Sequence, residues 1–97
     1  MHTSKKHHYQ ISVIGRVQGV GYRAFAKDVA DKLGVKGFVR NRRDGTVYME
    51  AEAPQMTVEK FLAECHKGPV FSKVDHMEII QVPVTDFTKF DIEPNSI

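Results

Sequence analysis

Apolar residues along the chain first alternate with polar ones and then recur at helical spacing. Between Tyr9 and Val17 the side chains that would share one face are apolar or glycine, and those between them are mostly polar. A period of two is typical of a strand with one buried face, so residues 9–17 are predicted to form a strand. From Tyr22 to Leu33 the apolar spacing changes to three and four residues. This predicts a helix with one buried face and Gly34 as its C-terminal cap.

The middle of the chain has the pattern of a β-hairpin. Residues 35–43 and 46–53 are each strand-like, with apolar side chains at alternate positions of the second segment. Between them stands Arg43-Asp44-Gly45-Thr46, which contains the Asp-Gly pair of a tight turn. Two antiparallel strands are therefore predicted after the first helix.

A second helical pattern follows the hairpin. Apolar residues from Val58 to Cys65 have the i, i+3, i+4, i+7 spacing of a one-sided helix, and Gly68-Pro69 marks its end. Two residues are candidates for the start of this helix. Pro54 suits a first helical turn, whereas Thr57 is the better capping residue, so the first turn stays open at this point.

Two further strand patterns, residues 74–84 and 88–93, complete the order of elements. The order strand-helix-strand-strand-helix-strand predicts an α+β fold of ferredoxin-like type. In this split β-α-β sandwich, two helices cover one face of an antiparallel sheet. The 97 residues contain no repeat, linker or low-complexity tract, so we expect a single domain. Its ordered core should span about residues 8–93, with loose ends at 1–7 and 94–97.

The composition indicates the general class of the protein but says little about its chemistry. Hydrophobic residues make up 41% of the chain and charged residues 27%, which is usual for a soluble globular protein. No apolar run is long enough for a membrane span, and the N-terminus lacks the apolar core of a signal peptide, so we expect a cytoplasmic protein. A formal net charge of +2 gives little general attraction for nucleic acid. The single cysteine excludes an intrachain disulfide and a thiolate metal cluster within one chain.

The connection between the first strand and the first helix has the composition of an anion site. Residues 18–21 read Gln-Gly-Val-Gly, and Arg23 follows in the first helical turn. Glycines let loop N–H groups converge on one point, and a helix N-terminus adds further N–H groups and the positive end of its dipole. The guanidinium of Arg23 would match two oxygens of a phosphate. A plain turn with a solvated arginine fits the local pattern equally well, because the lysine and hydroxyl of a nucleotide-triphosphate loop are missing.

The residues around this loop resemble the acylphosphatase family. The likeness is carried by GRVQGVGYR at residues 15–23, LGVKGFVRN at 33–41 and DGTV at 44–47, with Gly-Pro and Ser-Lys-Val in the link at 68–74. It covers about residues 9–93. The resemblance implies an enzyme that hydrolyses the carboxyl-phosphate bond of acyl phosphates to a carboxylate and inorganic phosphate, without a metal or another cofactor.

The resemblance also implies roles for individual residues. Arg23 falls on the family's phosphate-binding arginine, and Asn41 falls on the asparagine that positions the attacking water. The family's phosphate cradle falls on Gln18, Gly19, Val20, Gly21 and Tyr22. An acyl phosphate is a mixed anhydride with a good leaving group, so positioning suffices and no covalent nucleophile is required. An amide accepts no proton at neutral pH, so Asn41 would orient water without acting as a general base.

The chain departs from the family pattern at two places. Ala53-Pro54 replaces the usual glycine before the second helix, which puts the start of that helix in doubt. Residues 90–94 lack the basic residue that is common near the C-terminus, which puts in doubt how the last strand ends and whether it contacts the site.

Other residues that could carry chemistry are assigned structural roles. Cys65 lies on the apolar stripe of the second helix and lacks the arginine of a cysteine-dependent phosphatase loop, so it is predicted to be a core thiol. Asp44 is predicted to form the turn. The histidines are predicted to lie in a solvated tail or at the surface and strands rather than at a metal site: His2, His7, His8, His66 and His76.

The main alternative is a nucleic-acid-binding module. RNA-recognition domains share this element order, and residues 36–43 give a basic strand with one aromatic residue, Phe38. The RNA signature belongs on the third strand rather than the second, and Asn41 and Arg43 occupy positions where stacking aromatics are needed. A regulatory domain of the same fold would not need Arg23 and Asn41 together. We therefore expect a monomer with a small-molecule acyl phosphate as substrate, inorganic phosphate as product, and no nucleic-acid or membrane partner.

Overall fold

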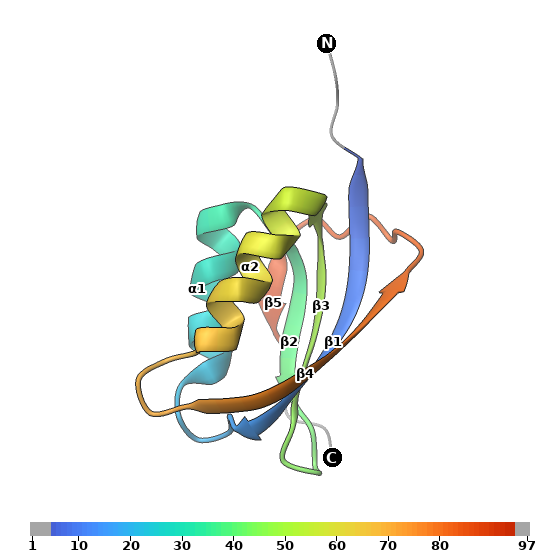
Figure 1. The fold of residues 1–97 in the computed structure, drawn as a ribbon. Helices are drawn as coiled ribbons and strands as arrows, with labels where there is room; N and C mark the ends of the chain where they lie inside the picture. The colour runs from blue at the N-terminus through green and yellow to red at the C-terminus, as the bar shows by residue number, and fades with distance from the viewer. Residues whose placement is uncertain (1–4, 95–97) are drawn as a thin grey trace.

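The computed structural model describes residues 5–94 and confirms the predicted α+β fold. Two helices lie against one face of a five-stranded sheet, and the other face, called the open face, carries no helix of the described residues (Figure 1). The elements, in chain order, are β1 Lys6–Arg16, α1 Tyr22–Leu33, β2 Lys36–Asn41, β3 Val47–Pro54, α2 Gln55–Lys67, β4 Lys73–Val82 and β5 Phe90–Ile92. Neither described helix is long and apolar enough to cross a membrane.

The sheet is mixed rather than antiparallel throughout. Its strand order is β4-β1-β3-β2-β5, and the pairs β1–β4, β1–β3 and β3–β2 are antiparallel as predicted. β5 instead pairs in parallel with β2, with Val39 opposite Ile92. The reason lies in the connection, residues 83–89. It leaves β4 at the end of the sheet where β2 begins and crosses to the far edge, so β5 runs in the same direction as β2 (Figure 1).

The core lies between the sheet and the two helices. The alternating residues of the strands and the helical stripes meet there, as their spacing predicted. Phe61 of α2 contacts Phe90 of β5 with ring centroids 5.8 Å apart, so the short last strand closes the core. The fully buried side chains of this layer include Ile11, Val13, Ala26, Ala30, Val39, Met49, Ala51, Val58, Phe61 and Cys65. Burial of each large apolar side chain contributes roughly 1.5 to 3 kcal/mol to folding.

The helix boundaries follow from local sequence. α1 has the predicted bounds, and its cap Gly34 has a φ of 79° with its N–H bonded to the carbonyl of Ala30. α2 begins at Gln55 with Pro54 at the N-cap position, so Thr57 lies inside the helix. Pro54 is also the last residue of β3. The chain therefore passes from strand to helix without a loop, and proline is tolerated there because the helix makes no use of the N–H group that proline lacks.

The N-terminal part of the chain corrects the predicted tail. β1 begins at Lys6 rather than Tyr9, because Lys6 and His7 pair with the end of β3. His8 is therefore not in a solvated tail. Its side chain is buried on the open face of the sheet, with a relative exposure of 2%. Residues 1–4, which include His2, and residues 95–97 lie outside the described residues.

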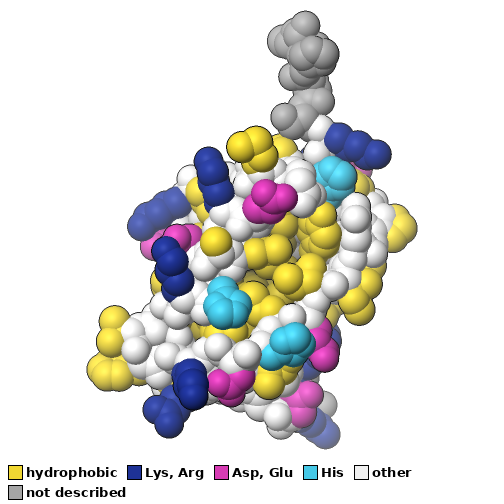
Figure 2. All heavy atoms as spheres, in the orientation of Figure 1, with side chains coloured by type: hydrophobic (Ala, Val, Ile, Leu, Met, Phe, Trp, Pro, Cys, Tyr) yellow, Lys and Arg dark blue, Asp and Glu magenta, His cyan; other side chains and the backbone are white. Residues whose placement is uncertain are grey.

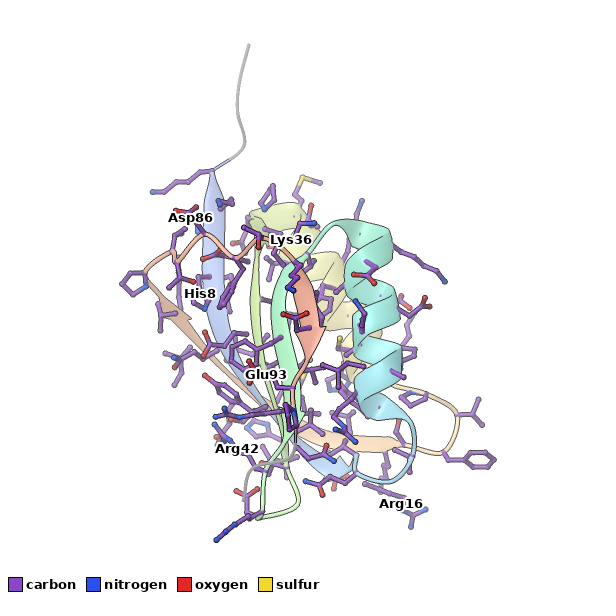
Figure 3. All side chains as sticks on the ribbon, turned by 180° about the vertical axis from the view of Figure 1, so that it is seen from behind. His8, Arg16, Lys36, Arg42, Asp86 and Glu93 are labelled. Carbon is purple, nitrogen blue, oxygen red and sulfur yellow. The ribbon has the colours of Figure 1, made fainter. Side chains whose placement is uncertain are left out.

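A buried acid–histidine cluster on the open face anchors the crossing segment 83–89. His8 Nε2 lies 2.6 Å from Glu50 Oε1, and His8 Nδ1 lies 2.9 Å from the carbonyl oxygen of Pro83. The Glu52 carboxylate, 1% exposed, accepts hydrogen bonds from the backbone N–H groups of Thr85, Asp86 and Phe87. Figure 3 shows His8 and Asp86 at the same end of this face. The segment that leads to β5 is thus tied down by β1 and β3.

We expect Glu52→Gln to lower the free energy of unfolding by about 2 to 3 kcal/mol near pH 7, because a buried carboxylate with several donors is lost. Burial alone raises the pKa of Glu52, but the N–H groups of Thr85, Phe87 and Asp86, together with His8, outweigh it and lower the pKa below its ordinary 4.5. A carboxyl with a lowered folded-state pKa stabilises the protein above its unfolded pKa. That stability is lost as the pH falls through the folded-state value.

Urea unfolding of both proteins at several pH values measures this effect. The difference in unfolding free energy should be complete above about pH 5 and should shrink as the pH falls below about 4. Glu78→Gln is a matched control, because Glu78 is an exposed carboxylate on β4. Its effect should stay within about 0.5 kcal/mol. Equal effects of the two substitutions would contradict an anchoring role for Glu52.

Candidate active site

A cavity of about 240 Å³ lies where the β1–α1 connection meets the ends of β2 and β5. It brings Arg23 of α1 and Asn41 of β2 onto one surface, together with Ile92 of β5. Among its lining residues in the described chain, Arg23 carries the only formal charge. The full lining consists of Val17, Gly19, Gly21, Tyr22, Arg23, Ala24, Asn41 and Ile92.

The loop and the start of α1 present backbone donors at this cavity. Gly19 and Gly21 have φ values of 73° and 80°, in the left-handed region that side-chain-bearing residues rarely adopt. Gly21 is the N-cap of α1, no side chain of the described residues caps the helix, and its first turn contains no acidic residue. The first helical bond runs from the N–H of Phe25 to the carbonyl of Gly21. The N–H groups before it have no helical acceptor and carry the positive end of the dipole.

Asn41 lines the cavity and carries an unpaired acceptor. It is the last residue of β2, and it continues the helix-facing row of Gly37 and Val39 to the end of that strand. The residue is 9% exposed, and its Oδ1 has no hydrogen-bond partner among the described residues. A buried amide oxygen without a partner costs about 1 to 3 kcal/mol, so a bound group such as water is its expected partner.

The side chain of Gln18 does not lie at the cavity, where a phosphate ligand would be expected. Gln18 Nε2 donates instead to the carbonyl oxygens of Arg42 and Thr46, at 2.6 and 2.8 Å. These two residues close the β2–β3 hairpin directly after Asn41. The side chain of Gln18 therefore fixes the loop relative to Asn41.

The side chains of Val20 and Tyr22 pack into the protein. Val20 packs partly against the core, and Tyr22 is 2% exposed. Tyr22 donates its hydroxyl proton to the carbonyl of Cys65 at 2.6 Å, and burial is the main cause that raises the pKa of this phenol above its ordinary value. Burial raises the pKa of the Cys65 thiol to about 12. Cys65 is thus a core thiol, as predicted, and the hydroxyl of Tyr22 is already bonded within the fold.

The remaining titratable candidates lie outside the cavity lining. Asp44 forms the predicted turn, since its Oδ1 accepts hydrogen bonds from the Thr46 hydroxyl at 2.6 Å and the Thr46 N–H at 2.9 Å. These hydrogen bonds hold the pKa of Asp44 below its ordinary value. His66 on α2 and His76 on β4 are exposed, as predicted.

The open face does not have the free aromatic surface of an RNA-binding sheet. Phe38 and Tyr48 do lie side by side there, with ring centroids 5.9 Å apart. The guanidinium groups of Arg40 and Arg42 lie 5.1 and 4.2 Å from the centroid of Tyr48, and Phe87 meets Phe38 edge to face at 5.9 Å. The chain's own side chains thus occupy the positions that stacked bases would take.

Comparison with known proteins agrees with this geometry. The acylphosphatase family model matches residues 9–92. An acylphosphatase of Bacillus licheniformis is 46% identical over 85 residues, which cover 87% of this chain and 94% of that one. The chain belongs to the acylphosphatase family. An acylphosphatase of Ligilactobacillus salivarius is 41% identical over 86 residues, with 87% and 94% coverage. The crystal structure of acylphosphatase from Bacillus subtilis superposes with a TM-score of 0.88 at 38% identity, over 90% of this chain and 98% of that one.

Membership of the acylphosphatase family establishes the reaction. The protein is a hydrolase of acid anhydrides that converts acyl phosphates to a carboxylate and inorganic phosphate. Its substrate is a small-molecule acyl phosphate, as the sequence motifs implied. Sequence reasoning did not place Val17, Ala24 and Ile92 in the lining of the cavity of this acylphosphatase. For Ile92 the only available signal was the weak strand pattern of residues 88–93.

Proposed function

We propose that Arg23 and the backbone N–H groups of residues 18–22 and of the α1 N-terminus hold the phosphoryl group, while Asn41 orients the attacking water. The observation that supports this is the shared cavity. Among the described residues, it joins a single cation, an uncapped helix start and an asparagine whose amide oxygen is unpaired. Cation and N–H groups suit a phosphoryl group, and the amide oxygen suits a water molecule.

In this mechanism the protein supplies position and charge rather than a covalent nucleophile. The water oxygen forms a bond to phosphorus while the bond from phosphorus to the acyl oxygen breaks, and the acyl group departs as a carboxylate. Arg23 and the N–H groups neutralise the charge on the equatorial oxygens, which is where phosphoryl transfer places it. The carboxylate is a good leaving group and Arg23 supplies the positive charge, so the proposed reaction uses no metal and no other cofactor.

The proton of the attacking water has no base to receive it in the proposed site. Asn41 does not ionise, and a guanidinium group is not a proton acceptor. Asp44, His66 and His76 are not part of the cavity lining. We therefore propose that the proton passes to a phosphoryl oxygen of the substrate itself.

A pH profile tests this proposal. We expect kcat to be nearly flat from about pH 6 to pH 8, because the proposed mechanism uses no acid or base of the enzyme. Any fall at lower pH should follow protonation of the substrate, whose second phosphate pKa is about 6 in a phosphoester and lower in an anhydride. The measurement is kcat at constant ionic strength, with a chelator present, for two acyl phosphates that differ in phosphate pKa.

Two outcomes would contradict the proposed mechanism. A bell-shaped profile with limbs at the same pH for both substrates would reveal an acid and a base of the enzyme. Asp44, His66 and His76 would then be the first residues to replace. Loss of activity on addition of the chelator would contradict the proposal that no metal takes part.

We further propose that the enzyme acts as a monomer in the cytoplasm. The groups that the proposed mechanism uses, which are Arg23, Asn41 and the N-terminus of α1, can all be supplied by a single copy of the chain. The single cysteine is free and buried, which suits a reducing compartment.

A further inference from the structure

Ile92 holds a defined position beside the proposed catalytic residues. It lies opposite Val39 in the parallel β2–β5 pair, and the N–H of Glu93 donates to the carbonyl of Val39 at 2.8 Å. Phe90, two residues earlier on the same face of β5, is buried in the core. Ile92 continues this row beyond the core, where it lines the cavity and remains 42% exposed.

The cavity lining contains little other accessible apolar surface. Val17 and Tyr22 each have only 2% of their surface exposed. Ala24 contributes a methyl group, and Gly19 and Gly21 contribute none. Ile92 is therefore the one large apolar side chain of the described lining that a ligand can contact over a substantial area.

The acidic neighbours of Ile92 do not give a negative charge to the wall of the cavity that Ile92 forms. Asp91 and Glu93 alternate with Ile92 along the chain, so their side chains belong to the opposite face. Glu93 Oε1 lies 3.7 Å from Arg40 Nη1, and Asp91 Oδ1 lies 3.9 Å from Lys89 Nζ. Figure 3 shows Glu93 over the open face of the sheet. The cavity thus combines one cation, Arg23, with an uncharged apolar wall.

The cation and the apolar wall of the cavity match the two ends of an acyl phosphate. The phosphoryl end is anionic and suits Arg23 with the N–H groups. The acyl end carries the carbon skeleton, for which an uncharged apolar side chain is a suitable contact. We propose that Ile92 is a specificity-determining residue that contacts the acyl group and favours uncharged aromatic or branched aliphatic acyl phosphates over acetyl phosphate. This inference rests on the proposed phosphate site.

Ile92→Ala tests the inference with benzoyl phosphate and acetyl phosphate as substrates. The ratio of kcat/KM for benzoyl phosphate to that for acetyl phosphate should fall by about fivefold, because several methylene-sized contacts with the larger acyl group are lost. Competitive inhibition by inorganic phosphate should change by less than about twofold, because phosphate has no acyl group. Ile92→Leu should keep the ratio near its wild-type value.

Ile79→Ala is the matched control. Ile79 is 44% exposed on β4, at the opposite edge of the sheet. Figure 2 shows the apolar side chains that gather between α2 and β4 on the face that carries the helices. Ile79→Ala removes the same atoms from a similarly exposed strand, so the substrate ratio should not change.

The outcomes distinguish failure of this inference from failure of the proposed phosphate site. An unchanged substrate ratio in Ile92→Ala, or an equal loss for both substrates, would overturn the role of Ile92. In that case phosphate would still compete with substrate in the wild-type enzyme. Failure of inorganic phosphate to compete in the wild-type enzyme would instead overturn the proposed phosphate site and, with it, the placement of the acyl group.

Discussion

Replacing Arg23 by lysine should lower kcat/KM for acyl phosphate hydrolysis by at least about 100-fold, or about 3 kcal/mol of transition-state stabilisation. Lysine keeps the positive charge at the start of α1 but has a single ammonium group. The planar guanidinium can bond to two phosphoryl oxygens at once, and this geometry is lost. The substitution therefore separates the effect of shape from the effect of charge.

Steady-state kinetics with inorganic phosphate as inhibitor measure this change. Phosphate should compete with the substrate in the wild-type enzyme and should bind less tightly to Arg23→Lys. Arg16→Lys is the control, since Arg16 is exposed at the end of β1 and is not part of the cavity lining. In Figure 3 it lies on the periphery of the molecule. A near-wild-type rate for Arg23→Lys, or noncompetitive inhibition by phosphate, would disprove the proposed role of Arg23.

Asn41→Ala should lower kcat on the order of 100-fold while the inhibition constant of phosphate changes by less than about threefold. The reason is that orientation of the attacking water matters in the transition state and contributes little to ground-state binding of phosphate. The Oδ1 of Asn41 has no partner within the described fold, so its removal deprives no protein donor of an acceptor.

Parallel measurements of kcat, phosphate inhibition and thermal unfolding distinguish the possible roles of Asn41. A fall in kcat alone supports orientation of water. Loss of phosphate affinity with kcat retained would instead make Asn41 a phosphate ligand. A melting temperature close to that of the wild type would show that the loss of rate does not come from unfolding.

The candidate site was predictable where a short motif specifies both conformation and chemistry. The glycines of the loop are needed for its left-handed backbone, and Arg23 follows at the start of the helix. The resemblance to acylphosphatases added Asn41, and the fold places Asn41 on the same cavity as Arg23. The role of the Gln18 side chain was not predictable, because its acceptors belong to the β2–β3 hairpin, at least 24 positions away.

The alternation of apolar and polar residues along a strand predicted which side chains share a face, but it did not predict what covers that face. Glu50 and Glu52 occupy the polar positions of β3, a pattern that is typical of a solvated surface. In the structure the segment 83–89 crosses this surface and buries Glu52 together with His8. The sequence around Glu52 contains no signal for that cover, because the covering residues lie 33 to 35 positions further on.

The sequence by itself determined both helices, the hairpin turn and the glycine-rich loop before α1 of this protein. Each of these features depends on residues within a few positions of one another, so periodicity and glycine placement are sufficient. Only the tertiary structure decided the direction of β5, the anchoring of the segment 83–89 and the place of Ile92 at the cavity. These features depend on contacts such as His8 with Pro83, 75 positions apart in the chain, and local pattern carries no information about such pairs.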